Sequence, residues 1–159
     1  MDRPLEGVIR RFEESFARRP THAAHAGGRV NLIGEHTDYN GGFVLPCALQ
    51  YGTYLVIRPN SDMILRFASA NMDFRTEVSL KEDFCRIDHE WVNYPLGVFQ
   101  QFRQKEIPET GFDMFFAGDI PNSAGLSSSA SIEMVTAYAL AVMLKAIDLE
   151  MIDLVKLSQ

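Results

Sequence analysis

Residues 118–131 form a run of small side chains that could hold an anion. They read GDIPNSAGLSSSAS, they follow the apolar segment 112–116, and an apolar-periodic segment runs on from Ile132 to Val142. This order predicts a strand, a loop of small residues and a helix. Free backbone N–H groups and the positive end of the helix dipole at such a helix start favour an anion, most commonly a phosphate.

A flexible linker is the alternative interpretation, because glycine and serine are the usual residues of linkers. A linker is not normally enclosed between a strand pattern and a helix of about four or five turns, so we favour the anion loop. It is not a Walker A loop, because no Gly-Lys-Ser/Thr follows it. No lysine stands between Gly118 and Leu144. The charge of a phosphate must therefore be offset by a metal cation or by a basic residue from elsewhere in the chain.

Residues 28–42 form a second stretch that is rich in glycine and in ionisable side chains. The ionisable residues are Arg29, Glu35, His36 and Asp38, and a turn signal follows at Asn40-Gly41-Gly42. One interpretation is an ordinary polar hairpin loop. The other is a polyol site, because carboxylates accept hydrogen bonds from sugar hydroxyls and a histidine can donate or accept them. The residue types alone leave both interpretations open.

A metal site is a third interpretation of the same region. It would use His22, His25, Glu35, His36 and Asp38. Two histidines three residues apart lie on opposite faces of a strand and cannot chelate one ion together, although on a helix they could. We rank this interpretation below the other two, because the spacing is not diagnostic of a metal.

Apolar spacing predicts the helices that must position these stretches. One amphipathic helix covers about residues 5–17, before Arg18-Arg19-Pro20, and a second begins with Pro95 in its first turn. Near the end, Asp148 can cap a helix from about Leu149 whose apolar positions are Ile152, Val155 and Leu157. The aromatic residues Trp91, Tyr94 and Phe99 have helix-like spacing, which favours core packing over a purine-stacking surface.

The strand pattern predicts an α+β fold. Strands are expected at residues 21–26, continuing at 30–33, and at 51–58 and 63–68, the last two joined as a hairpin by the turn Pro59-Asn60-Ser61-Asp62. Residues 74–80 alternate again and predict a further strand. Strands and helices mix without regular βαβ alternation, so we expect a mixed, largely antiparallel sheet packed with helices.

Length and composition bound the class of protein. The chain has 159 residues, 47% of them hydrophobic, which fits one domain over residues 1–159. Its net charge of −6 gives nucleic acid no general attraction, and no apolar run reaches membrane-spanning length. Cys47 and Cys85 form no zinc or redox motif, and the N-terminus lacks a signal-peptide core, so we expect a cytoplasmic protein. The chain stops inside a helical pattern, from which we expect an N-terminal portion of a longer protein.

Two stretches together resemble the galactokinase family within the GHMP sugar and metabolite kinases. Residues 28–42, GRVNLIGEHTDYNGG, look like the N-terminal galactokinase signature, and residues 121–131, PNSAGLSSSAS, look like the GHMP phosphate motif. Residues 91–98 resemble a segment that these enzymes carry between them. The resemblance implies the N-terminal domain of a GHMP kinase, ribosomal protein S5 domain 2-like in fold, without its C-terminal domain.

The resemblance also implies roles for individual residues. Arg29 would lie near the transferring phosphoryl group, and Glu35, His36 and Asp38 would hold the sugar hydroxyls. ATP would bind through Gly125, Leu126, Ser127, Ser128, Ser129, Ala130 and Ser131, with Ser129 as a ligand of Mg²⁺ and Trp91 near the adenine. The implied reaction moves the γ-phosphoryl group of ATP to the C1 hydroxyl of galactose, with no nucleic-acid or membrane partner.

The chain departs from the family pattern in two ways. Gly27 stands where the family commonly has a proline. The family's catalytic aspartate and acidic magnesium ligand come after the phosphate motif, in a segment that these residues do not include, and Asp119 matches neither. We therefore expect the 159 residues alone to be inactive. A non-catalytic galactokinase-like sensor of sugar and ATP, or an N-acetylgalactosamine kinase, would share most of these residues, but the intact phosphate motif favours an enzyme.

Overall fold

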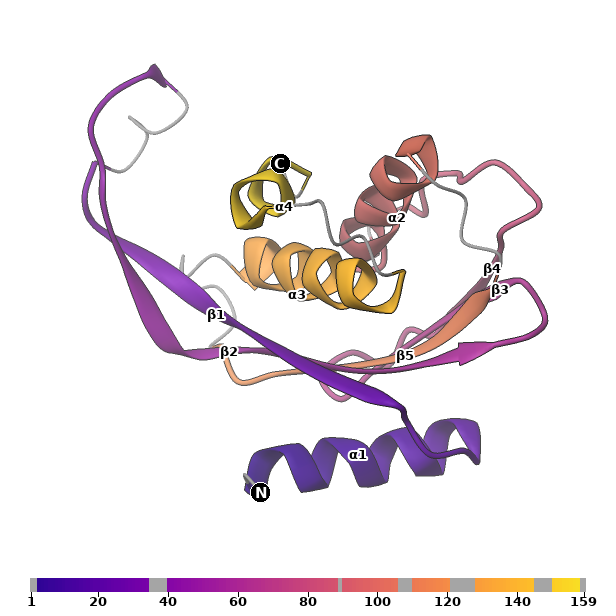
Figure 1. The fold of residues 1–159 in the computed structure, drawn as a ribbon. Coiled ribbons are helices and arrows are strands. Elements are labelled where there is room, and N and C mark those ends of the chain that lie inside the picture. Colours follow the sequence, from indigo (N-terminus) through magenta and orange to yellow (C-terminus); the bar gives the residue numbers. More distant parts are fainter. Residues whose placement is uncertain are drawn as a thin grey trace.

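The computed structural model describes residues 3–34, 40–88, 90–105, 110–120, 128–144 and 150–157. Helices and strands alternate irregularly along this part of the chain (Figure 1). In chain order they are α1 (Arg3–Phe16), β1 (His22–Ile33), β2 (Leu45–Asn60), β3 (Ile64–Ser69), β4 (Thr76–Ser79), α2 (Asn93–Lys105), β5 (Gly111–Gly118), α3 (Ser128–Met143) and α4 (Met151–Leu157). Sequence periodicity therefore predicted all of the helices and strands, with shifted ends.

The five strands form one mixed sheet in the order β1-β2-β5-β3-β4. Every neighbouring pair is antiparallel except β3 and β5, so the predicted mixed, largely antiparallel sheet is confirmed. The predicted hairpin between β2 and β3 is wrong, because β5 lies between these two strands. The reason is burial: residues 111–116 are all buried, and a strand that is apolar on both faces belongs at the centre of a sheet.

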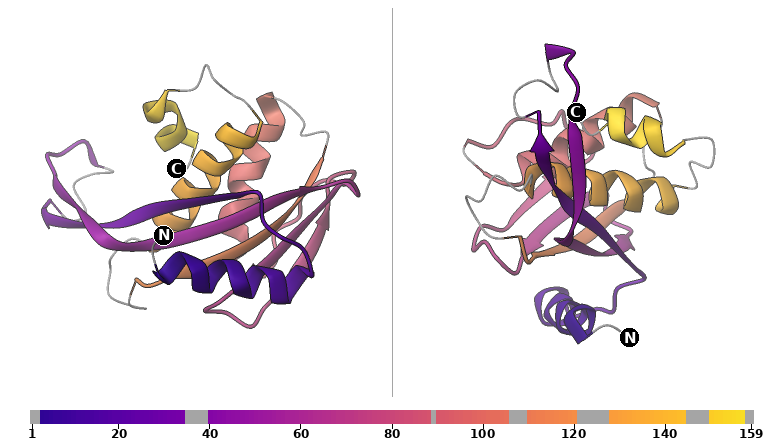
Figure 2. Two further views of the ribbon diagram at one scale, coloured as in Figure 1. Left: turned by 60° about the horizontal axis from the view of Figure 1, so that its bottom comes forward. Right: turned by 90° about the vertical axis from the view of Figure 1, so that its left-hand side faces the viewer.

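Helices cover both faces of the sheet, α1 on one side and α2, α3 and α4 on the other (Figures 1 and 2). The alternation of β5 divides its side chains between two cores. Phe115 packs with Phe12 of α1, whereas Met114 and Phe116 belong to the larger core under α2 and α3. The predicted amphipathic helix α1 is confirmed, and it ends at Phe16, where Ala17 takes a left-handed conformation with φ 53°.

The aromatic residues before α2 only partly match the expected core. Trp91 and Phe99 are buried, and the Trp91 ring meets Phe116 edge to face at a centroid distance of 5.3 Å. Tyr94 is 43% exposed, so its predicted core position is wrong. The Asn93 side chain fixes this turn by donating to the Glu90 carbonyl and accepting from the Ile87 amide.

Helix α4 confirms the expected last helix but buries a different side. Ile152 and Val155 are exposed, whereas Leu154 is buried against the main core. Which face of so short a helix is buried depends on what it packs against, and its sequence does not contain that information. The expected cap Asp148 lies outside the described residues. Among the described residues, no helix is long and apolar enough to cross a membrane.

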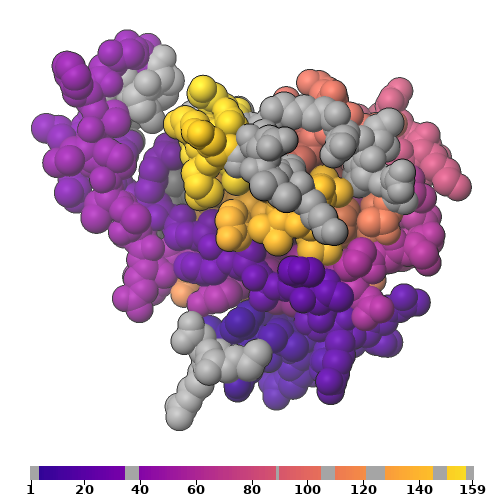
Figure 3. Space-filling view, in the orientation of Figure 1, coloured from indigo at the N-terminus to yellow at the C-terminus, as the bar shows by residue number. Residues whose placement is uncertain are grey.

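The end of β1, from Arg29, and the beginning of β2, before Gly52, form an arm that stands away from the helices (Figures 1 and 3). Apolar side chains are exposed on it and just before β2, including Leu32 and Ile33 on β1 and Phe43 ahead of β2. The register shifts between Gly27 and Arg29, where the arm leaves the body of the sheet. A Cβ at Gly27 would lie 2.7 Å from the Leu49 carbonyl oxygen, so glycine allows a close approach of the two strands here.

Candidate functional site

A cavity of ≈ 230 Å³ lies between the end of β5 and the beginning of α3. Thr53, Trp91, Gly118, Ser128, Ser129 and Ile132 are among the residues that line it. Three residues predicted to bind ATP, namely Trp91, Ser128 and Ser129, are therefore brought together from positions about 40 residues apart in the sequence. Their common cavity has apolar walls and a serine-bearing helix start, which suits a flat ring joined to an anionic group.

The Trp91 indole nitrogen lies buried without a hydrogen-bond partner among the described residues. A buried N–H group without a partner costs free energy, so tryptophan normally places it where a protein, water or ligand acceptor can reach it. The residue also lines the cavity. The indole therefore offers a planar apolar surface on which a purine base can pack.

The first turn of α3 supplies the polar side of the cavity. Ser128 begins the helix and is exposed, and Ser129 and Ala130 are half-buried. The Ser131 hydroxyl is used inside the protein instead, because it donates to the Ala26 carbonyl at 2.8 Å and lies 2.9 Å from the Thr53 hydroxyl. Gly125, Leu126 and Ser127, which complete the predicted phosphate loop, lie outside the described residues.

Arg29 lies on β1, where it pairs with Ala48 of β2. The Ala26 carbonyl, which accepts the Ser131 hydrogen bond, lies on the same strand. Arg29 comes three positions after Ala26, which is roughly 10 Å along an extended strand. The sheet thus places a cation on the strand that anchors the start of α3. The predicted sugar ligands Glu35, His36 and Asp38 lie outside the described residues.

The two histidines of the metal interpretation have other neighbours in the structure. His22 lies 3.0 Å from the Thr21 hydroxyl, and the His25 ring packs at a tilt against the Tyr54 ring, with a centroid distance of 4.4 Å. Among the described residues, no group of three or more histidine, cysteine, aspartate or glutamate side chains could hold a metal ion.

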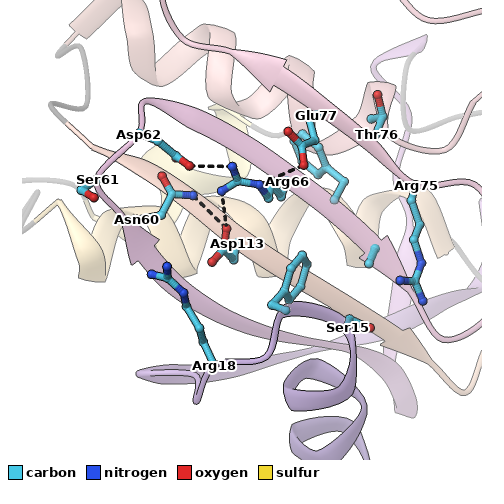
Figure 4. A pocket seen from close by; sticks show the side chains of 13 residues that line it. Ser15, Arg18, Asn60, Ser61, Asp62, Arg66, Arg75, Thr76, Glu77 and Asp113 are labelled. Atoms are coloured by element: carbon cyan, nitrogen blue, oxygen red, sulfur yellow. Dashed lines mark hydrogen bonds and ion pairs between the residues drawn. The ribbon is translucent and has the colours of Figure 1, made fainter.

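A second cavity, of ≈ 480 Å³, lies on the α1 side of the sheet (Figure 4). At its centre the Arg66 guanidinium meets three carboxylates, at 2.6 Å from Asp62, 3.0 Å from Glu77 and 3.1 Å from Asp113. Asn60 donates to the same Asp113 oxygen at 2.9 Å. None of these residues was predicted to be functional, and their mutual pairing is that of a structural ion cluster.

Glu133 of α3 makes the stability of the domain depend on pH. Burial raises the pKa of its carboxyl group above the ordinary value of 4.5. Because the raised pKa belongs to the folded state, ionisation of Glu133 lowers the stability as the pH rises through about 4.5 and above. Glu133→Gln should raise Tm by about 1–2 °C at pH 7 and leave it nearly unchanged at pH 4. Thermal unfolding at both pH values, with the exposed Glu82→Gln as control, measures this, and an equal shift at both pH values would contradict it.

Comparison with known proteins gives matches along most of the chain. A family model described as "Galactokinase galactose-binding signature" matches residues 10–59, and another, "GHMP kinases N terminal domain", matches residues 93–159. Galactokinases from Fusobacterium nucleatum and Exiguobacterium sibiricum are 44% and 45% identical over 98% and 99% of this chain. The chain spans 41% and 40% of these two proteins, or about two fifths of the curated relatives.

Solved structures agree with these matches. Lactococcus lactis galactokinase, crystallised with galactose, superposes on 98% of this chain with a TM-score of 0.88 at 32% identity, and the match covers 41% of that protein. Methanococcus jannaschii mevalonate kinase superposes on 86% of this chain and 44% of its own length, with a TM-score of 0.71 at 23% identity, which shows the shared fold. The predicted fold class is thereby confirmed.

Proposed function

Because this chain belongs to the galactokinase family of the GHMP kinases, we propose that the protein transfers the γ-phosphoryl group of ATP to the C1 hydroxyl of galactose. The observation that carries the proposal is the cavity in which Trp91 faces the first turn of α3. It offers a place for a nucleotide base beside a place for its phosphates. The match of residues 10–59 to a galactose-binding signature supports the sugar as the acceptor.

The nucleotide would lie along the cavity from Trp91 to α3. Its base would pack against the indole, and its phosphates would accept hydrogen bonds from the N–H groups of the helix start. The Ser128 and Ser129 hydroxyls stand at that end of the cavity. Residues 125–127 would complete the phosphate site.

The donor set fits Mg²⁺ only together with the nucleotide. Ser129 would supply one hydroxyl oxygen, and phosphate oxygens would supply others, since Mg²⁺ prefers oxygen ligands and is commonly held by substrate phosphates. When bound, the ion neutralises charge on the phosphate oxygens. Arg29, supplied from β1, would stabilise the phosphoryl group in transfer, which offsets the absence of lysine near the phosphate motif.

The sugar would be held by Glu35, His36 and Asp38, beyond Arg29 along the same segment. Two carboxylates and an imidazole can accept from and donate to several hydroxyl groups at once, and charge-assisted hydrogen bonds of this kind are strong and directional. The Lactococcus lactis relative, solved in complex with galactose, supports galactose as the sugar. We also propose a cytoplasmic location, which the two exposed free thiols Cys47 and Cys85 support.

A coupled ADP assay on the full-length protein tests the function. With ATP and Mg²⁺ present, galactose should give rapid ADP formation, whereas mevalonate and homoserine should give only background. Faster turnover with N-acetylgalactosamine than with galactose would reassign the acceptor. Binding of sugar and ATP without ADP formation would identify a sensor and refute the proposed reaction. The 159 residues alone should give no ADP with galactose.

A further inference from the structure

Two consecutive residues of β2 hold both walls of the nucleotide cavity. One wall comes from the end of β5 through Gly118 and Ile120, and the other comes from α3 through Ser129 and Ile132. Gly52 bonds the chain just after β5, and Thr53 bonds α3. The end of β5 and the start of α3 are therefore both attached to the same place on β2, Gly52-Thr53.

The first attachment joins Asp119 to both polar backbone groups of Gly52. The Gly52 N–H donates to Asp119 Oδ1 at 2.6 Å, and the Asp119 N–H donates to the Gly52 carbonyl at 3.1 Å. The carboxylate makes the first bond charge-assisted, and such bonds are about twice as strong as neutral ones. A Cβ at residue 52 would lie 2.2 Å from the Ala26 carbonyl oxygen, so only glycine fits where β1, β2 and Asp119 meet.

The second attachment joins Ser131 to Thr53 and Ala26. The Ser131 hydroxyl donates to the Ala26 carbonyl at 2.8 Å and lies within hydrogen-bonding distance of the Thr53 hydroxyl, at 2.9 Å. Thr53 is 4% exposed and Ser131 is 1% exposed, so the loss of either partner would leave a buried polar group unpaired. Chained hydrogen bonds in such a buried place reinforce one another.

A third contact steadies the β5 wall from its other side. The Asn71 side-chain amide donates to the Gly118 carbonyl at 2.9 Å and accepts from the Gly118 N–H at 2.8 Å. It thus continues the pairing with β5 after the last β3 pair, Ser69 with Phe116. The end of β5 is held on the β3 side by Asn71 and on the β2 side by Asp119.

We propose that Asp119 and Ser131 are positioning residues for the ATP site, fixing the end of β5 and the start of α3 at a set separation through Gly52 and Thr53. The inference rests on the proposed kinase function. Neither side chain needs to touch ATP. Each acts by keeping Ser128, Ser129 and Trp91 at fixed positions around the nucleotide. Small displacements of such groups lower the rate of a catalysed reaction strongly.

Steady-state kinetics on the full-length protein separate positioning from simple stabilisation. Asp119→Ala and Ser131→Ala should each raise the KM for ATP about tenfold and leave the KM for galactose within about twofold. Asp119→Asn keeps an acceptor oxygen for the Gly52 N–H, so it should restore most of the ATP affinity that Asp119→Ala loses. Thr53→Val keeps the side-chain shape and removes the same Ser131–Thr53 bond, so it should raise the KM for ATP as Ser131→Ala does and replaces that variant if Ser131→Ala folds poorly.

The matched control is Thr21→Val. Thr21 also bonds a β2 carbonyl, that of Ile57 at 3.2 Å, but at the far end of the β1–β2 ladder. This variant should lose stability and keep the wild-type KM for ATP. If the Asp119, Ser131 and Thr53 variants lose stability but also keep that KM, the positioning role is overturned and the bonds serve the fold alone.

Direct nucleotide titration distinguishes this failure from failure of the proposed function. ATP binding can be followed by tryptophan fluorescence, with Trp91→Phe as the blank for the Trp91 signal. Wild-type protein that binds no ATP would overturn both proposals. Wild-type protein that binds ATP, with Asp119→Ala and Ser131→Ala binding it equally well, would overturn only the positioning role. Weaker binding by both variants supports it.

Discussion

Replacing Arg29 with alanine should lower the kcat of galactose phosphorylation by about 100- to 1,000-fold, with much smaller changes in either KM. Phosphoryl transfer spreads negative charge over the oxygens of the moving group, and a fixed cation lowers the energy of that state more than that of bound ATP. The chain offers no lysine between Gly118 and Leu144. Arg29 stands on β1, three residues beyond the α3 anchor Ala26, and is the cation that the family resemblance assigns to this role.

Two further variants make the Arg29 result specific. Arg29→Lys keeps the charge but loses the planar fork of donors, so it should recover only part of the lost kcat. Arg75→Ala removes an arginine from the cavity on the α1 side and should leave kcat unchanged. An Arg29→Ala enzyme with wild-type kcat would exclude Arg29 from the mechanism, whatever its effect on substrate affinity.

The largest expected loss of stability comes from Arg66→Met, at about 2–3 kcal/mol, or roughly 5–10 °C in Tm. Loss of the Asp113 contact costs most, because this side chain is only 5% exposed and would keep one side-chain donor among the described residues, Asn60. Surface ion pairs contribute much less, so the exposed partners Asp62 and Glu77 add little. Denaturant unfolding of the full-length protein and its variant measures the difference.

Acidification should remove only the small part of the Arg66→Met effect that Asp62 contributes. The hydrogen bond from Arg66 holds the pKa of Asp62 below its ordinary value of 3.8. A carboxyl with a lowered folded-state pKa stabilises the fold above the unfolded pKa, and this contribution disappears as the pH falls below about 3.8.

Glu77→Gln should cost under about 0.5 kcal/mol at pH 7, and Asp113→Asn should restore part of the loss in the Arg66→Met background. An Arg66→Met protein as stable as wild type at pH 7 would contradict the burial argument.

Local periodicity was enough to find the elements but not their neighbours. The apolar spacing of α1 and the alternation of β4 are visible in short windows, and both are present in the structure. The pairing of β2 with β5 joins residues more than 50 positions apart, so the short turn after Asn60 predicted the wrong partner. The buried face of α4 was missed for the same reason, because the surface that covers Leu154 comes from other elements.

The candidate site divides in a similar way. Motifs located Ser128, Ser129 and Trp91, which share the cavity, because the chemistry of a phosphate loop restricts residue types over a few adjacent positions. The bonding partners of Asp119 and Ser131 lie 67 and 105 positions away in the chain. Nothing near either residue in the sequence indicates such a partner, and Thr53 carries no motif at all.

The central place of β5 also affects how this domain is made on the ribosome. β3 ends at Ser69 and β5 begins at Gly111, so about 40 residues, or roughly 2–8 s of synthesis, separate them. During that interval β2 and β3 have left the ribosome without the strand that belongs between them, and unpaired strand edges invite wrong pairing. The short turn at residues 61–63 brings these two strands close enough to pair directly. Any direct pairing of β2 with β3 must be reversed before β5 can take its place between them.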